Sequence, residues 1–300
     1  MNSEFERNVV DIWGEKGKSW LGCLPTLLED LSQNWEFQER RAFSNLTYSY
    51  VTRVDYKGFP AVLKITFPCE RASREIAWYT FQASRGCPEL LRADEKQGAM
   101  LLEEISPATT CKLLVTEGKD DDATKAIVQA LIGLKHRPCT NKKFPHVRDF
   151  LTSLEKLQGR VEETLLLEAI KLLDKLTSDS SKDVLLHGDL HHDNVLRSSD
   201  NWIAIDPHGY IGPRCFEVGA MMCNPYDCFP SDIPLSEIVC NRVERLSELL
   251  PFSKYEIQTW SIIYTLISSS WNLEDRGEIP KMQLQIASSL HQDLNQMKGI

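Results

Sequence analysis

The feature that most limits how this chain can fold is the stretch LHGDLHHDNVL, residues 186–196. A short apolar run at residues 184–186 precedes it, and a second apolar run at residues 202–205 follows it. Both runs have the length of β-strands, whereas most of the chain beyond residue 106 carries apolar residues at helical spacing. The sequence therefore predicts a polar loop that is held between two short strands inside a mainly helical region.

The region before residue 106 follows a different pattern. Its first forty residues are amphipathic and predict helix, and the residues after them are rich in β-branched and aromatic side chains between turn signals. In this region we expect strands at 46–54, 61–65, 89–94 and 99–105, and a helix at 70–82. In the remainder we expect helices at 123–134, 147–176, 235–250, 255–271 and 282–297. The chain is thus predicted to have two lobes, residues 1–105 rich in strands and residues 106–300 mainly helical.

The composition excludes several classes of protein. The 43 acidic and 34 basic residues give a formal net charge of −9, whereas nucleic-acid binders usually present a basic face. No apolar run approaches the roughly 20 residues needed to span a bilayer, and the N-terminus lacks the basic and apolar segments of a signal peptide. Nine cysteines without a secretory signal favour reduced thiols. We therefore expect a cytoplasmic protein that has neither nucleic acid nor a membrane as a partner.

The polar loop matches the pattern H-x-D-L-x-x-x-N through His187, Asp189 and Asn194. This pattern is typical of the catalytic loops of protein kinases. Phosphoryl transfer from ATP needs a carboxylate that accepts the proton of the acceptor hydroxyl, and it needs oxygen ligands for Mg²⁺. An Asp and an Asn five residues apart can point both groups into one cleft, and Asp206 adds a second carboxylate after the apolar run at 202–205.

The N-terminal region supplies two further pieces of the same chemistry. The segment Ala61-Val62-Leu63-Lys64 is similar to the kinase V-A-I-K strand, and Glu75 lies eleven residues further on in the predicted helix. A lysine strand, a glutamate helix, the polar loop and a final aspartate thus occur in the order that kinases use. Each feature alone is weak, but together they indicate Mg²⁺-dependent phosphoryl transfer.

On these residues the chain resembles the aminoglycoside-phosphotransferase branch of the protein-kinase-like fold. More narrowly, it is similar to the streptomycin 6-kinase type, the aminoglycoside/hydroxyurea antibiotic resistance kinase family. The resemblance covers nearly the whole chain: it is most specific in the polar loop and in AIDPHGYIG, residues 204–212, and softer at 11–21, 61–64, 100–103 and 270–275. It implies an α+β, bilobal fold with an antiparallel-sheet N-lobe for the nucleotide and a helical C-lobe for the catalytic loop and the acceptor.

The resemblance also implies roles for the residues of the loop. Asp189 would be the catalytic base, supported by His187, and Asn194 and Asp206 would be the Mg²⁺ ligands. Glu217 is expected to tether the segment that follows Asp206. Catalysis would then come from positioning and charge stabilisation, without a covalent intermediate on the enzyme.

Nucleotide binding is assigned to the first lobe in the same way. The residues implied are Lys64 and Glu75 for the phosphates, and the backbone of Glu103 to Ile105 for adenine. The expected phosphate-covering loop, residues 42–48, contains no glycine, so that Ser44 and Asn45 would offer hydroxyl and amide groups instead. ATP is the expected nucleotide, and the choice between ATP and GTP stays open.

The acceptor is expected to be a small cationic molecule, a streptomycin-like aminoglycoside whose phosphorylation inactivates the antibiotic. Carboxylates and an aromatic face would hold its guanidino or amino groups. The candidate residues are Asp193, Trp271, Glu274 and Asp275. An alternative interpretation makes residues 274–277 an ordinary loop at the end of a helix and Asp193 a solvated loop residue.

Other interpretations of these motifs stay open. The acceptor could be hydroxyurea, choline or a sugar, and the glycine-free loop is also compatible with a catalytically silent, pseudokinase-like nucleotide-binding scaffold. A protein-kinase role is disfavoured because an A-P-E motif is missing. A zinc site would need ligands without any C-x-x-C pair, drawn from His191, His192, His208, Cys215, Cys223 and Cys228. Both a monomer and a homodimer are compatible with the sequence.

Overall fold

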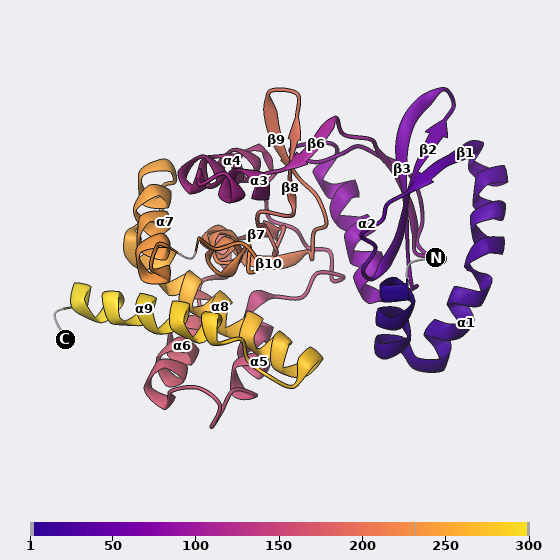
Figure 1. Ribbon diagram of the computed structural model, residues 1–300. Helices are drawn as coiled ribbons and strands as arrows, with labels where there is room; N and C mark the ends of the chain where they lie inside the picture. Colours follow the sequence, from indigo (N-terminus) through magenta and orange to yellow (C-terminus); the bar gives the residue numbers. More distant parts are fainter. Residues whose placement is uncertain (1–2, 231, 299–300) are drawn as a thin grey trace. The chain divides into compact units, whose positions relative to one another are not determined.

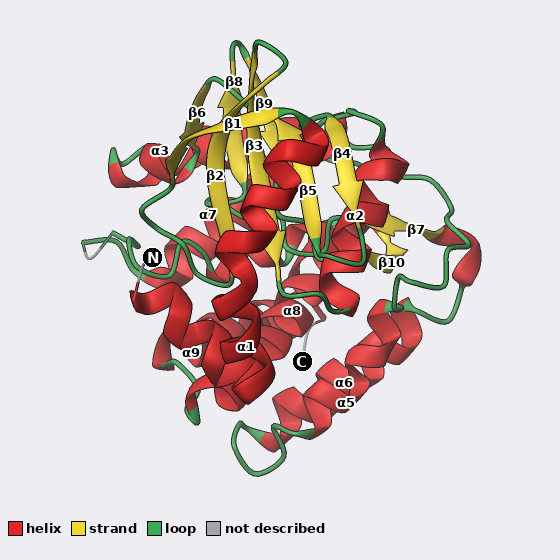
Figure 2. Ribbon diagram, turned by 90° about the vertical axis from the view of Figure 1, so that its right-hand side faces the viewer, coloured by secondary structure: helices red, strands yellow, loops and turns green. Residues whose placement is uncertain are grey.

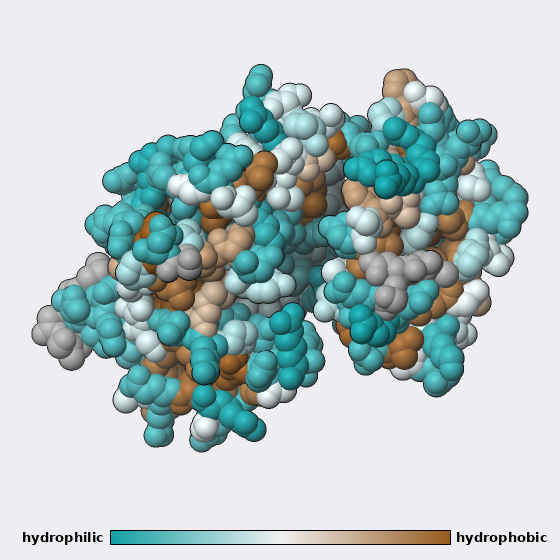
Figure 3. Space-filling view, in the orientation of Figure 1, coloured by the Kyte–Doolittle hydropathy of each residue, from teal (hydrophilic) through white to brown (hydrophobic). Residues whose placement is uncertain are grey.

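A computed structural model of the chain describes residues 3–230 and 232–298 (Figure 1). The chain separates into two compact units, unit 1 with residues 1–106 and unit 2 with residues 107–300. Within the described residues, no helix is long and apolar enough to cross a membrane. The face drawn in Figure 3 is largely hydrophilic, and its apolar side chains lie in small separate areas.

Unit 1 is built on a five-stranded antiparallel sheet with the strand order β1-β2-β3-β5-β4. Its strands are β1 (Phe37–Ala42), β2 (Ser49–Tyr56), β3 (Phe59–Thr66), β4 (Leu90–Asp94) and β5 (Ala99–Glu103), and its helices are α1 (Ser3–Trp35) and α2 (Glu70–Gln82). Lys57 and Gly58 join β2 to β3 with φ of 53° and 84°. Positive φ at both positions is what a two-residue hairpin turn of type I′ requires, so this turn fixes the register of β3.

Helix α1 packs on one face of this sheet, and helix α2 contacts the opposite face. Leu63 and Ile65 of β3 belong to a core that includes Phe5 of α1, and Figure 2 shows α1 in front of the strands. Because successive side chains of a strand point to opposite faces, Lys64 points away from this core. Glu75 of α2 meets it there, with 2.7 Å between Lys64 Nζ and Glu75 Oε1. The alternation in β3 thus brings the predicted lysine and glutamate together on the face opposite α1.

The expectation of helix over the first forty residues is wrong at its end. Helix α1 stops at Trp35, Glu36 has φ 61°, and residues 37–42 form the edge strand β1. The strand reads FQERRA, with one large apolar side chain and four exposed residues, so it carries no alternating pattern by which the sequence could reveal it. Gly14 is also non-helical, with φ 56° and ψ −136°, and α1 is therefore two helices joined at a kink.

Unit 2 combines helices with two small antiparallel sheets, β10-β7 and β6-β8-β9. Its helices are α3 (Lys112–Thr116), α4 (Asp120–Gly133), α5 (Leu151–Glu155), α6 (Glu163–Leu176), α7 (Leu235–Leu249), α8 (Lys254–Arg276) and α9 (Lys281–Lys298). Its strands are β6 (Pro107–Thr110), β7 (Asp183–Leu186), β8 (Val195–Ser198), β9 (Asn201–Ala204) and β10 (Tyr210–Pro213). The two apolar runs beside the polar loop are β7 and β9, whereas β6, β8 and β10 were not expected.

The expected helix over residues 147–176 is wrong in its middle. A short 3-10 helix, Val147–Phe150, leads into α5, and α6 begins only at Glu163. The intervening turn contains Gly159 at φ 71°, a left-handed conformation that a continuous helix does not contain. The apolar spacing persists across this turn because both helices pack against α8, so periodicity alone did not show the break.

Helix α8 is the centre of unit 2 and packs against α5, α6, α7 and α9. All of its residues from Ile257 to Ile267 are buried. Four of its buried hydroxyl groups donate a hydrogen bond to the backbone carbonyl four residues earlier, those of Thr259, Ser261, Thr265 and Ser269. A helix with polar residues can therefore be buried on all sides without leaving these hydroxyls unpaired.

Candidate active site

The polar loop of residues 187–194 connects β7 to β8, and a buried carboxylate fixes its start. Glu217, in the 3-10 helix Arg214–Val218, accepts hydrogen bonds from the backbone N–H of His187 at 2.6 Å and of Gly188 at 3.0 Å. Burial raises the pKa of Glu217, but the hydrogen bond and charge of His136 and the N–H of Gly188 outweigh burial and lower it. An ionised Glu217 thus fixes the start of the loop through hydrogen bonds to His187 and Gly188. The sequence had suggested that Glu217 would instead bind the segment after Asp206.

Gly188 is required where the loop turns. Its φ is 83°, and a Cβ atom there would lie 2.4 Å from the ring of Tyr210 in β10. A side chain would therefore be strained by the backbone conformation and would also collide with the neighbouring strand. The absence of a side chain lets the loop pass close to β10.

His187 joins the loop to the segment that carries Asp206. Its Nδ1 accepts from the N–H of Asp189 at 3.3 Å, which leaves Nε2 as the donor to the carbonyl of Ile205 at 2.8 Å. Its own carbonyl accepts from the N–H groups of His208 and Gly209. Burial lowers the pKa of His187, so the ring is neutral. These bonds give His187 the geometry of a supporting residue and leave its ring no free nitrogen for proton transfer.

Asp189 is held at both carboxylate oxygens. Oδ1 accepts the hydroxyl of Tyr264 at 2.7 Å, and Oδ2 lies 3.3 Å from Nδ2 of Asn194 and 3.5 Å from Nε2 of both His191 and His208. Burial raises the pKa of Asp189, but the charges of His208 and His191 and the hydrogen bonds from His191 and Tyr264 outweigh it and hold the pKa well below its usual range. The side chain is therefore an oriented, ionised carboxylate.

Tyr264 is a residue that the sequence interpretation missed. It lies on α8, 75 residues after Asp189, and its approach depends on Gly219, where a Cβ atom would lie 2.3 Å from the Cβ of Tyr264. Burial and the charge of Asp189 raise the pKa of Tyr264 well above its usual value, so it remains a hydrogen-bond donor. The sequence did contain one signal for this contact, namely a tyrosine within the apolar run of α8. A buried tyrosine hydroxyl needs a hydrogen-bond partner, so Tyr264 could have been expected to bond another side chain.

Asn194 lies beside this carboxylate, and Asp206 adds a further negative charge to the region. Nδ2 of Asn194 donates to the carbonyl of Asp189 at 2.9 Å, which leaves Oδ1 available as an acceptor or metal ligand. Asp206 follows β9 with φ 58°, a left-handed conformation that a residue other than glycine rarely adopts. Burial lowers the pKa of His191, yet the carboxylates around it, Asp189, Asp193 and Asp206, raise it overall. The loop is thus a region of concentrated negative charge.

These donors fit Mg²⁺ better than a softer metal. Mg²⁺ prefers oxygen ligands, takes one or two from the protein and keeps waters and substrate phosphates for the rest. Asn194 and Asp206 are such a pair. Among residues 3–230 and 232–298, no group of three or more His, Cys, Asp or Glu side chains is arranged to hold a metal ion.

Unit 1 brings together Lys64 and Glu75, the predicted phosphate-orienting pair, and it also contains the other predicted nucleotide residues. Lys64 and Glu75 are joined at 2.7 Å, and their side chains are 12% and 6% exposed. Ser44 and Asn45 are exposed in the connection between β1 and β2. Glu103 ends β5, and its N–H donates to the carbonyl of Glu89 at 2.9 Å.

The predicted acceptor residues lie in different surroundings. Asp193 is half-buried in the loop, 3.4 Å from Nζ of Lys112. Trp271 makes edge-to-face contacts with Tyr264 and His208, both of which contact Asp189. Glu274 is exposed and paired with Lys156 at 2.6 Å, and Asp275 is exposed in the last turn of α8. The structure therefore groups Trp271 and Asp193 with the loop and directs Glu274 towards Lys156.

Sequence comparisons connect this site with a family of kinases. The family described as aminoglycoside/hydroxyurea antibiotic resistance kinase matches residues 34–276. The streptomycin 6-kinase of Streptomyces glaucescens is 26% identical over 273 residues, 88% of this chain and 87% of that protein. The streptomycin 3″-kinase of Klebsiella pneumoniae is 30% identical over 236 residues, 76% of this chain and 85% of that protein.

A solved structure supports the fold. The aminoglycoside phosphotransferase APH(4)-Ia matches with a TM-score of 0.59 at 16% sequence identity, covering 89% of this chain and 98% of that one. A likeness at this identity bears on the fold alone. The predicted fold class, an α+β protein-kinase-like fold with an antiparallel-sheet lobe and a mainly helical lobe, is confirmed.

Proposed function

This chain belongs to the aminoglycoside/hydroxyurea antibiotic resistance kinase family, and from that premise we propose that it transfers the γ-phosphate of ATP to a hydroxyl of a streptomycin-like aminoglycoside. As a member of this family it is a phosphotransferase that acts on hydroxyl groups. The observation that carries the proposal is the ionised carboxylate of Asp189, which is oriented from both sides and lies beside Asn194, in a loop whose His191 also feels the charge of Asp206.

Asp189 is the base in this proposal. Its Oδ1 accepts the Tyr264 hydroxyl at 2.7 Å, and its Oδ2 lies within 3.5 Å of Asn194, His191 and His208 side chains, so the carboxylate is held in one orientation in which it takes the proton of the acceptor hydroxyl. The lowered pKa of Asp189 keeps it ionised and favours a role in aligning the hydroxyl, with the proton transferred late. Positioning and charge stabilisation therefore supply most of the rate, and no covalent enzyme intermediate is needed.

Asn194 and Asp206 are the proposed Mg²⁺ ligands. The hydrogen bond from Asn194 Nδ2 to the Asp189 carbonyl turns Oδ1 of the same amide outwards. When it is bound with ATP, Mg²⁺ would neutralise charge on the phosphate oxygens. The hydrogen bonds of His187 to Asp189 and to Ile205 fix the position of the base relative to the segment that carries Asp206.

Unit 1 is the proposed nucleotide-binding unit. Lys64 neutralises the nucleotide phosphates, and Glu75 holds its ammonium group in place at 2.7 Å. The backbone from Glu103 to Ile105 is proposed to hydrogen-bond adenine, and Ser44 and Asn45 to contact the phosphates. The nine cysteines are all free thiols, which supports a cytoplasmic location, where thiols stay reduced.

A coupled ATP-consumption assay tests the proposal. Purified protein is assayed with MgATP and MgGTP against streptomycin, other aminoglycosides, hydroxyurea and choline, with Asp189→Ala as the inactive control. We expect turnover with ATP that depends on streptomycin and is lost in the control. Tight MgATP binding without turnover on any acceptor would contradict the proposal and would favour a silent nucleotide-binding scaffold.

A further inference from the structure

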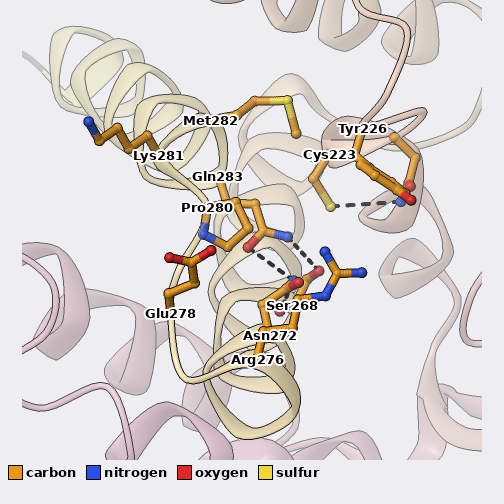
Figure 4. Close-up of a pocket in the computed structure, with 11 residues that line it drawn as sticks. Cys223, Tyr226, Ser268, Asn272, Arg276, Glu278, Pro280, Lys281, Met282 and Gln283 are labelled. Atoms are coloured by element: carbon orange, nitrogen blue, oxygen red, sulfur yellow. Dashed lines mark hydrogen bonds between the residues drawn. The ribbon is translucent and has the colours of Figure 1, made fainter. Parts of the chain in front are cut away.

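One side of α8 carries a row of polar side chains at four-residue spacing, namely Tyr264, Ser268, Asn272 and Arg276. Residues four apart are neighbours on the surface of a helix, and each step advances about 6 Å along the axis. Tyr264, the first member of the row, donates to Asp189. The other three line a cavity of about 370 Å³ within unit 2 (Figure 4). The row therefore leads from the proposed base into a cavity of small-molecule size.

The rest of the cavity wall comes from two segments. They contribute Cys223, Asn224 and Tyr226 from one side, and Glu278, Pro280, Lys281, Met282 and Gln283 from the other. Buried Arg242 fixes the first segment, because its guanidinium donates to the carbonyls of Met221 and Asn224 and pairs with Asp120 at 2.6 Å. Arg242 thus fixes this part of the cavity wall, and the cavity is present without a ligand.

Three side chains on the floor of the cavity orient one another. Gln283 Nε2 donates to the hydroxyl of Ser268 at 2.8 Å, and Asn272 Nδ2 donates to the carbonyl of Ser268 at 2.9 Å and lies 3.4 Å from Gln283 Oε1. Each amide NH₂ has two donors, and both donors of Asn272 are used within this group, so one N–H of Gln283 remains for a ligand. Within the described residues, no hydrogen bond to Oδ1 of Asn272 is found. The floor consequently offers a fixed donor on Gln283 and an acceptor on Asn272 without carrying charge.

The charges around this cavity disfavour a cationic group. Arg276 lies beside the amides in Figure 4, whereas Lys281 points away from them, and Glu278 is the one carboxylate among the lining residues. Burial raises the pKa of the Cys223 thiol to about 12, so this group is neutral. A guanidinium has donors and no acceptor, and it would meet a like charge at Arg276. A hydroxyl group both donates and accepts, which matches the amide floor.

We propose that this cavity binds an uncharged, polyhydroxylated ring of the acceptor. The inference rests on the proposed function, and it specifies which chemical part of the acceptor is recognised there. The amides of Asn272 and Gln283 hydrogen-bond the ring hydroxyls, and the exposed ring of Tyr226 covers one face of the ligand. Because the row on α8 ends at Tyr264, a ring bound here places the rest of the acceptor towards Asp189.

A titration that needs no turnover tests the ligand class. In a ¹⁵N-labelled sample, the side-chain amide signals of Asn272 and Gln283 are identified through the variants Asn272→Leu and Gln283→Leu. We expect millimolar myo-inositol, an uncharged polyol, to shift both signals in a saturable way, and guanidinium at equal concentration to leave them in place. Shifts with guanidinium alone, or with neither probe, would overturn the proposal whatever the enzyme phosphorylates.

Steady-state kinetics test the link to the reaction. With streptomycin as the probe, Asn272→Leu is expected to raise its KM about tenfold and to leave the KM of ATP unchanged, since a hydrogen-bonding group that faces the acceptor is removed. The matched control is Asn295→Leu, an amide on α9 outside the cavity, and Glu278→Gln tests recognition of a cation. An Asn272→Leu effect no larger than that of the control, or smaller than that of Glu278→Gln, would overturn the proposal.

The two proposals fail separately in these experiments. If wild-type protein does not phosphorylate streptomycin, the proposed function is wrong, and the myo-inositol titration decides the cavity by itself. If streptomycin is phosphorylated and Asn272→Leu behaves like the control, the function stands and the cavity assignment is wrong. Circular dichroism verifies that each variant is folded, and Gln283→Leu provides a second variant of the same floor.

Discussion

The pair Lys64–Glu75 in unit 1 depends on contacts between residues close in sequence, whereas the Asp189 loop in unit 2 depends on residues far away in sequence. Lys64 lies on a strand and Glu75 on the helix that follows it, eleven residues later. The Asp189 loop depends on distant residues, with Glu217 bonded 30 residues from His187 and Tyr264 bonded 75 residues from Asp189. One hairpin and one helix are enough to form the first site, whereas the second forms only when much of unit 2 has packed.

The difference predicts how each site responds to mutation. Changes near Lys64 should alter nucleotide binding and leave the rest of the protein as it is. Changes in the partners of the Asp189 loop should alter the chemical step, and some of them should also alter the stability of unit 2, because those partners are buried between its elements. Four substitutions test this contrast.

Asp189→Asn should have the largest effect. The amide keeps the size of the side chain but cannot accept a proton, so kcat should fall about 10²- to 10⁴-fold. The KM of ATP should change little, because the loop partners other than the carboxylate remain. Single-turnover kinetics with MgATP measure the chemical step directly. A decrease smaller than about tenfold would remove Asp189 from the role of base.

Lys64→Met should come second and should affect a different constant. Loss of one positioned charge next to the phosphates is expected to cost about 10²- to 10³-fold in kcat/KM for ATP, while the protein stays folded although the nearly buried Glu75 loses this partner. The measurement is kinetics at varied ATP together with a melting curve. The contrast between the two sites breaks if Lys64→Met instead unfolds the protein, or if only the KM of the acceptor changes.

Glu217→Gln should lower the free energy of unfolding and should leave the KM of ATP nearly unchanged. Replacing the carboxylate weakens two buried hydrogen bonds to the loop and should cost about 2 kcal/mol of unfolding free energy. Because the pKa of Glu217 is lowered in the folded chain, its stabilisation is present above its ordinary value of 4.5 and is lost as the pH falls through the lowered pKa.

Urea unfolding between neutral pH and pH 3 measures this effect of Glu217. The difference between wild type and Glu217→Gln should shrink as the pH decreases, and the exposed Glu237→Gln on α7 should behave like the wild type throughout. A difference that stays constant with pH would show that the charge of Glu217 does not hold the loop.

Tyr264→Phe should have the smallest effect of the four. The ring and its packing remain, and only the hydrogen bond to Asp189 Oδ1 is lost, so kcat should fall about tenfold with the KM of ATP unchanged. The matched control is Tyr255→Phe, at the start of the same helix. A purely structural role for Tyr264 would leave kcat unchanged in the folded variant, and the long-range support of Asp189 would then need another explanation.

The same contrast explains what the sequence could predict. Lys64 and Glu75 belong to neighbouring elements, and the pattern H-x-D-L-x-x-x-N occupies one loop, so local spacing was enough to propose both. Glu217 and Tyr264 act across long stretches of chain, and no local pattern states which helix will pack against the loop. Strand β8 was missed because it directly follows the polar loop and reads VLRS, which has apolar residues only in its first half.

The acceptor side was harder to predict for a related reason. The sequence suggested carboxylates next to Trp271, but Glu274 is paired with Lys156, whereas Asn272 and Arg276 line the cavity. Which side of α8 faces a cavity depends on how α9 packs against it, and helical periodicity in a helix that is buried all round does not reveal this.

We propose that this chain phosphorylates a hydroxyl of a streptomycin-like acceptor with Asp189 as the base. The most direct test of this proposal is the mass spectrum of streptomycin after incubation with MgATP and either wild-type protein or Asp189→Asn. We expect streptomycin that carries one phosphoryl group with the wild type, and almost none in the same time with the variant. Unmodified streptomycin in both reactions, or equal amounts of phosphorylated product from both proteins, would contradict it.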